Sequence, residues 1–209
     1  MRSAGPKRTD LPKKISMRKV VLNLAVSLDG FIEGPNGEFD WCLNDQDYGM
    51  ADFFFDTDTI FIGRKSYELV AGLEDQYFPG IDKVCVFSDT ISDATHPKVE
   101  IITSQSFDER VNQILSDDEG RQVWLFGGAN LLTTFLKKKL VSEMLLSVHP
   151  VILGGGKPLF QQLQNRVNLM LTGTQAYDSG LVQLRYILKP EFDYGMLDAS
   201  FTNPELNNF

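Results

Sequence analysis

Apolar residues lie in short, nearly continuous runs along the first part of the chain. The run over residues 20–26 is interrupted only by Asn23. A run of this kind is typical of a strand that is covered on both faces of its sheet. The same pattern predicts further strands over residues 59–62, 83–87, 99–102 and 122–126.

Helical spacing fills some of the gaps between these runs. Apolar side chains recur at intervals of three and four over residues 107–115 and 131–136, which predicts two helices with one apolar face each. The second helix is expected to end at the lysines 137–139, whose charges suit the negative end of a helix dipole.

The pattern after Leu140 indicates strands only, over residues 144–148, 169–172 and 181–188. Alternating strands and helices followed by strands predict an α/β fold: a mostly parallel central sheet, helices on both faces, and antiparallel C-terminal strands. We expect one domain over residues 17–189, between a flexible tail at 1–16 and a second tail at 190–209.

Composition narrows the functional classes. The net charge of −8 argues against unspecific binding to nucleic acid or membranes, because both are anionic. Two cysteines and two histidines give neither a disulfide framework nor a His-rich metal site, so no metal is expected. No apolar run reaches the length of a membrane helix or a secretory signal, and a cytoplasmic enzyme is expected.

A glycine-rich segment follows the first predicted strand. It contains Gly30, Gly34 and Gly37 together with Pro35 and Asn36. Open α/β sheets bind ligands at the carboxyl ends of their strands, and a long glycine-rich loop there can close over a ligand. The composition fits an ordinary connection equally well.

Two further motifs stand where a predicted strand leads into a helix. Gly63-Arg64-Lys65-Ser66 puts two cations at a helix start, where the dipole disfavours them unless an anion binds, and Ser66 can cap the helix or donate to that anion. The pair Gly127-Gly128, before Ala129 and Asn130, would let the backbone approach a pyrophosphate. Taken alone, the first is equally a solvated basic pair and the second a turn.

The order of these motifs is more specific than any one of them. The chain reads SLDGFIEGPNG, GRKS, FGGAN and then LLSVHPVILGGGKPLF, each at the end of a predicted strand or along one. This order resembles the dihydrofolate-reductase superfamily, and within it the reductase domain of the bifunctional riboflavin-biosynthesis deaminase/reductase and its stand-alone relatives. The resemblance runs from about residue 19 to residue 188.

The resemblance implies an NAD(P)H-dependent reductase of a small heterocyclic substrate. It implies that the nicotinamide ring lies between Ala25 and Ile32, that the adenosine 2′-phosphate of NADPH is held at one helix start and one strand end, and that the pyrophosphate meets the double-glycine turn. The phosphate-binding residues would be Gly63, Arg64, Lys65, Ser66, Ser88, Gly127, Gly128, Ala129 and Asn130. Asp89 beside Ser88 would repel a phosphate, so NADH is the alternative cofactor.

The same resemblance places the substrate acid at Asp47, with Asp45 and Asp52 as neighbours that could serve instead. Ser147 falls on the strand position next to that acid. Activity of the dihydrofolate-reductase type and a non-catalytic dinucleotide-binding protein of the same fold are the alternatives in function. The resemblance also implies a homodimer. No zinc-deaminase signature, H-x-E with P-C-x-x-C, occurs in the chain.

Overall fold

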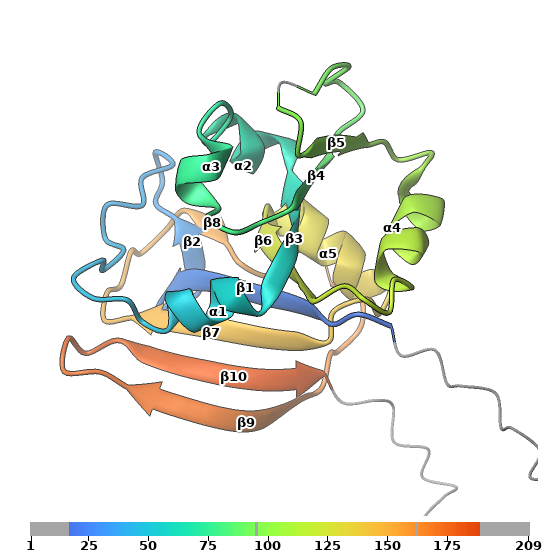
Figure 1. The fold of residues 1–209 in the computed structure, drawn as a ribbon. Helices are drawn as coiled ribbons and strands as arrows, with labels where there is room; N and C mark the ends of the chain where they lie inside the picture. The colour runs from blue at the N-terminus through green and yellow to red at the C-terminus, as the bar shows by residue number, and fades with distance from the viewer. Residues whose placement is uncertain (1–16, 95, 162, 189–209) are drawn as a thin grey trace, which may run out of the picture.

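The main sheet holds eight strands in the order β5-β4-β3-β6-β1-β7-β10-β9 (Figure 1). The structure is a computed structural model and describes residues 17–94, 96–161 and 163–188. Both predicted tails, 1–16 and 190–209, lie outside the described residues.

In chain order the elements of the described residues are β1 (Val20–Ser27), β2 (Phe31–Glu33), α1 (Met50–Phe55), β3 (Thr57–Gly63), α2 (Arg64–Glu68), α3 (Glu74–Tyr77), β4 (Lys83–Phe87), β5 (Val99–Ile102), α4 (Phe107–Leu115), β6 (Gln122–Gly127), α5 (Ala129–Lys137), β7 (Glu143–His149), β8 (Lys157–Pro158), β9 (Leu169–Ala176) and β10 (Val182–Leu188).

The sheet confirms the predicted fold class. The six strands from β5 to β7 pair in parallel, whereas β10 runs antiparallel to β7 and β9 antiparallel to β10. Because parallel strands present their carboxyl ends at one edge of a sheet, the turns after β1, β3, β4 and β6 lie along the same edge.

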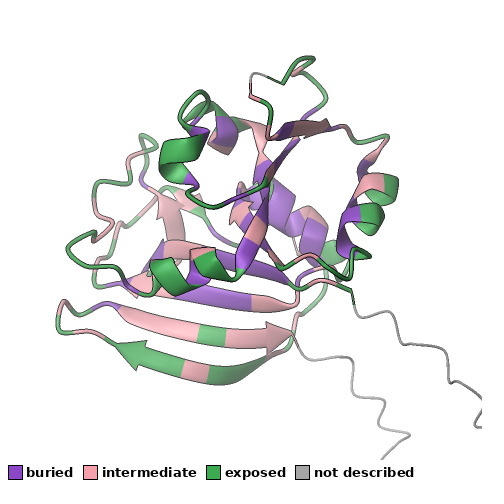
Figure 2. Cartoon of the chain, in the orientation of Figure 1, coloured by how far each residue is buried: buried purple, intermediate pink, exposed green. Residues whose placement is uncertain are grey.

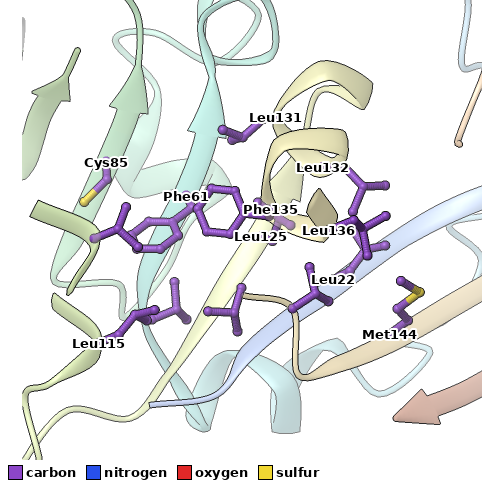
Figure 3. Packing of buried hydrophobic residues seen from close by; sticks show 14 of the residues in the cluster. Leu22, Phe61, Cys85, Leu115, Leu125, Leu131, Leu132, Phe135, Leu136 and Met144 are labelled. Atoms are coloured by element: carbon purple, nitrogen blue, oxygen red, sulfur yellow. The ribbon is translucent and has the colours of Figure 1, made fainter. Parts of the chain in front are cut away.

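Apolar packing covers both faces of the central strands, as the run at 20–26 predicts. Leu22 of β1 belongs to a buried cluster with Phe61 of β3 and Phe135 of α5 (Figure 3). The preceding residue, Val21, belongs to a second buried cluster, which includes Phe53 of α1. Alternate residues of one strand thus serve two cores, which holds the sheet between its helices.

The glycine-rich segment after β1 differs from the expected free loop. It contains β2, which pairs with β8 to form a separate two-stranded sheet, with Phe31 opposite Pro158. The amide of Leu28 donates to the carbonyl of Val151 at 2.9 Å, and that of Leu159 to Gly30 at 2.9 Å. Strands of two and three residues are too short for an alternating pattern, so the sequence does not reveal this pairing.

One edge of the main sheet is exposed to solvent. The strand β9 is mostly exposed and forms the outer edge beyond β10, while the central strands are buried (Figure 2). Along the described part of the chain, no helix combines the length and apolar character that crossing a membrane requires.

Candidate active site

A cavity of about 560 Å³ lies at the carboxyl edge of the sheet, where β3, β4, β5 and β6 end. Its walls are the turns that follow these strands and the first residues of α2 and α5. The lining residues are Gly63, Arg64, Lys65, Ser66, Phe87, Ser88, Asp89, Thr90, Ile102, Thr103, Ser104, Phe107, Gly128, Ala129, Asn130, Leu131, Thr134 and Lys157. Eight of the nine residues expected to bind cofactor phosphates are therefore gathered at one site, and the ninth, Gly127, directly precedes Gly128.

The two glycine turns pack against each other with little space between their backbones. A Cβ atom on Gly63 would lie 3.5 Å from the carbonyl oxygen of Gly127 and 3.9 Å from the Cα of Gly128. Gly128 has a φ of 92°, a conformation that side chains other than glycine resist, and it is the N-cap of α5. This turn leaves the first amide groups of α5 directed toward the cavity.

Ser66 does not cap the helix that starts at Arg64. Gly63 is the N-cap of α2 and no side-chain cap is formed, so of the two roles expected for Ser66 the structure does not show capping. The Ser66 hydroxyl instead faces the second turn, 3.7 Å from the position of a Cβ on Gly128. It remains available to donate to a ligand in the cavity.

Three cationic side chains line the cavity, and two of them form ion pairs. Arg64 forms an ion pair with Glu68, with 2.5 Å between Nη1 and Oε1, and Lys157 pairs with Glu33 at 2.8 Å. Lys65 is exposed, and no described residue forms an ion pair with it. The acid Asp89 lines the same cavity, and its Oδ1 accepts a bond from the amide of Ser104 at 2.7 Å.

Ser88 anchors the turn after β4. It is buried, and its Oγ accepts bonds from the amides of Thr90 and Ile91, both at 3.1 Å. These bonds hold the turn after β4, which lines the cavity, in a defined conformation.

A row of polar side chains marks the other half of the edge. Strand register places Ala25 of β1 opposite Ser147 of β7, and Ser147 opposite Gln183 of β10, so all three point to one face. The Gln183 amide nitrogen donates to Ser147 Oγ at 3.2 Å and to the Tyr48 carbonyl at 2.9 Å. Ser147, predicted as a substrate-side residue, is therefore part of an ordered polar network.

Asp47 lies just before α1 and is exposed. Its carboxylate accepts bonds from the amides of Gly49 and Ala51, both at 3.1 Å. Both partners belong to its own turn and helix start, and Asp47 does not line the cavity of about 560 Å³. The role of Asp47 as the substrate acid stays a prediction.

Ile32 and Ala25, the two residues expected beside the nicotinamide, are both half-buried and lie outside the cavity of about 560 Å³. Ile32 is in β2 and packs against the core cluster of Leu22. The segment before it is fixed by Asp29, whose carboxylate accepts bonds from the amides of Leu153 at 3.2 Å and Gly154 at 2.8 Å. The hydroxyl of Ser27 and these amides hold the pKa of Asp29 below its usual value.

Sequence reasoning missed His149. It ends β7, it is buried, and its ring packs edge-on against that of Trp41 with centroids 5.3 Å apart. The signal was present, since His149 is two residues after Ser147 and so points to the same face of its strand. The described residues contain no group of three or more His, Cys, Asp or Glu that could hold a metal ion.

Comparison with known proteins identifies the family. Residues 80–183 match the RibD C-terminal domain. The chain is 41% identical over 191 residues to the uncharacterized protein YyaP of Bacillus subtilis (strain 168), covering 84% of this chain and 98% of that protein. The protein YwjB of the same organism is 38% identical over 176 residues, covering 81% and 98%.

Solved structures agree with this result. A putative riboflavin biosynthesis protein from Shewanella sp. PV-4 superposes with a TM-score of 0.70 at 26% identity, covering 82% of this chain and 99% of that one. A deaminase/5-amino-6-(5-phosphoribosylamino)uracil reductase from Thermotoga maritima gives a TM-score of 0.65 at 15% identity, and this chain spans 57% of its length. With its dihydrofolate-reductase-like fold, the chain belongs to the family of the RibD C-terminal domain.

Proposed function

We propose that this protein is an NADPH-dependent reductase of a small heterocyclic substrate, resembling 5-amino-6-(5-phosphoribosylamino)uracil reductase. Membership of the RibD C-terminal domain family supports an oxidoreductase of the pyrimidine-reductase type. The observation that carries the proposal is the cavity that joins the GRKS, Ser88 and double-glycine turns at one sheet edge. The chain has no zinc-deaminase signature, so the proposal concerns the reduction step alone.

The cavity fits the phosphates of a dinucleotide. The amides at the start of α5, a helix of nine residues, suit the pyrophosphate, because they supply unpaired donors at the positive end of the helix dipole. Arg64, Lys65 and Ser88 stand on the remaining walls and suit the 2′-phosphate. When bound, the cofactor would supply the hydride, while the protein binds it, orients it and excludes water.

Replacing Arg64 with alanine should weaken NADPH more than NADH, because only NADPH carries the 2′-phosphate. Loss of one charge-assisted hydrogen bond predicts roughly a tenfold rise in the Kd for NADPH. Titration of both cofactors, followed by fluorescence, measures the two effects. Glu68→Ala is the matched control, since it removes the partner of Arg64 and keeps the guanidinium. An equal loss for both cofactors in Arg64→Ala would contradict the 2′-phosphate assignment.

Replacing Asp47 with asparagine separates its two roles. The side-chain oxygen of asparagine can still accept from one of the two amides that Asp47 holds, so stability should change little. If the Asp47 carboxylate orients or protonates the substrate, kcat should fall strongly while NADPH affinity stays nearly unchanged. Full turnover in Asp47→Asn would show that this carboxylate serves only to hold its own turn and the start of α1.

We also propose a homodimer with twofold symmetry, the commonest closed arrangement. Its support is the outer strand β9, where Met170 and Leu171 are 43% and 51% exposed on a sheet edge that no other described strand pairs with. Exposed edges of this kind are usually covered or protected in stable proteins. Sedimentation at micromolar concentration should give twice the mass of the chain, and a monomer would contradict the proposal.

The direct test of the proposed activity is NADPH oxidation with two substrates. The protein should oxidise NADPH in the presence of 5-amino-6-(5-phosphoribosylamino)uracil, and much more slowly with dihydrofolate. Preference for dihydrofolate would replace this proposal by a folate reductase. Cofactor binding without oxidation of either kind would indicate a binding protein that has lost the chemistry.

A further inference from the structure

His149 carries a buried nitrogen that lacks a hydrogen bond. The residue is 3% exposed, and its Nε2 has no partner among the described residues. The other ring nitrogen, Nδ1, lies 2.9 Å from the carbonyl oxygen of Ser147. Because a carbonyl oxygen can only accept, Nδ1 is the donor in this contact, and the tautomer with its proton on Nδ1 presents Nε2 as an acceptor.

The neighbours of Nε2 do not satisfy it. Trp41 meets the imidazole edge-on, but its own indole N–H donates to the carbonyl of Glu38 at 3.3 Å. The hydroxyl of Ser27, opposite His149 in the strand register, donates to Asp29 at 2.7 Å and accepts from Phe31 at 2.9 Å. Leaving a buried acceptor unpaired costs free energy, so a ligand that supplies a donor would gain from binding here.

His149 lies in line with the polar row described above. Residues two apart on a strand are about 6.6 Å apart along its axis, so a small ring can meet both Ser147 and His149. Ser147 Oγ accepts a bond from Gln183 at 3.2 Å, and no described residue accepts its hydroxyl hydrogen. The pair therefore offers a donor at Ser147 and an acceptor at His149, which is complementary to the C=O and N–H groups of a cyclic amide.

We infer that His149 is a substrate-recognition residue whose Nε2 accepts a hydrogen bond from a ring N–H of a pyrimidinedione. In this arrangement the Ser147 hydroxyl donates to an adjacent ring carbonyl, and the ring N–H approaches Nε2 in the plane of the imidazole. The inference rests on the proposed function and deepens it, since it names the chemical group by which the heterocycle is selected.

The test compares two probes on the full-length protein saturated with NADP⁺. The first is 5,6-diaminouracil, and the second is its 1,3-dimethyl derivative, which keeps both carbonyls and lacks both ring N–H groups. Wild-type protein should bind the first roughly tenfold more tightly, the value of one good hydrogen bond. His149→Leu should lose most of this preference, and His149→Gln, which can place a carbonyl oxygen near the position of Nε2, should keep part of it.

Ser147→Ala provides a second, independent variant. It should weaken both probes and leave their ratio nearly unchanged, because the methylated probe keeps its carbonyls. His96→Leu, at the other histidine of the chain, should match wild type. NADPH affinity should vary by less than about twofold across the set, since none of these residues lines the phosphate cavity.

The outcomes separate the inference from the proposed function. A wild-type preference for the N–H probe that His149→Leu and His149→Gln both retain in full would overturn the role of His149 and leave the proposed function standing. Equal affinity of wild type for the two probes, with turnover of the pyrimidine substrate intact, would also overturn it. Failure of wild type to bind either probe or to reduce the pyrimidine would overturn the proposed function, and the inference with it.

Discussion

Asn130→Asp should weaken NADPH binding strongly while slightly stabilising the fold. Asn130 is the second residue of α5, it is exposed, and it lines the cavity proposed for the pyrophosphate. A carboxylate at a helix start gains about 0.3–1 kcal/mol from the helix dipole. The same charge repels a bound phosphate, and about 2–3 kcal/mol at a partly screened site corresponds to a rise of roughly 30- to 150-fold in Kd.

The opposite signs of the two effects make this variant informative, because poor folding cannot explain lost binding. Calorimetric titration of NADPH and thermal unfolding measure them separately. Asn112→Asp in α4 makes the same charge change outside the cavity lining and should leave the Kd unchanged. High salt should narrow the difference between Asn130→Asp and wild type. An unaltered Kd in Asn130→Asp would remove the start of α5 from the cofactor site.

Asp58→Ala should lower the free energy of unfolding by about 3–5 kcal/mol, because it leaves a buried guanidinium without its counter-ion. The side chain of Arg18 is 5% exposed and that of Asp58 15%. Arg18 donates to Asp58, and the other carboxylate oxygen accepts from the amide of Arg121 at 2.7 Å. These contacts join the starting ends of β1, β3 and β6, opposite the edge that holds the cavity.

Thermal and denaturant unfolding of Asp58→Ala measure this loss. Asp82→Ala is the control, because Asp82 pairs with the same Arg121 at 3.8 Å but is 81% exposed, and exposed pairs contribute about 0–1 kcal/mol. A loss in Asp58→Ala no larger than that in Asp82→Ala would show that the Arg18 contact is not a stabilising one.

The same pair predicts how stability depends on pH. Burial opposes ionisation of Asp58, but the Thr59 hydroxyl, the Arg121 amide and the Arg18 cation together hold its pKa below the usual value. A lowered pKa in the folded state means that the stabilisation is complete above the unfolded pKa of about 3.9 and is lost as the pH falls through the folded value. The difference between wild type and Asp58→Ala should therefore be constant near neutral pH and shrink only in strong acid.

Most of the main sheet could be predicted because its central strands are buried on both faces. Continuous apolar runs such as the one around Val21 and Leu22 are typical of strands covered on both sides, and they located the central strands. The exposed strand β9 was found instead from the strand-like pattern after Leu140. The short elements gave no such signal. α3 has four residues and β8 two, so neither repeats its period often enough to give a recognisable sequence pattern.

That these turns would meet at one cavity could be predicted for a topological reason. GRKS and the double-glycine turn are far apart in sequence, but each ends a parallel strand, and β3 and β6 are neighbours in the sheet. The contacts that could not be predicted involve segments with no helix or strand periodicity in their sequence. Lys157 reaches the cavity through the pairing of β8 with β2, and Trp41 meets His149 through an irregular connection.

The most direct measurement of the central claim is a turnover balance with 5-amino-6-(5-phosphoribosylamino)uracil. NADPH oxidation and formation of the ribitylamino product are followed in the same reaction, because hydride transfer requires one NADPH for each product molecule. The account predicts equal amounts of the two, with the rate strongly reduced at limiting NADPH in Asn130→Asp. Binding of NADPH without product, or product formed without loss of NADPH, would contradict it.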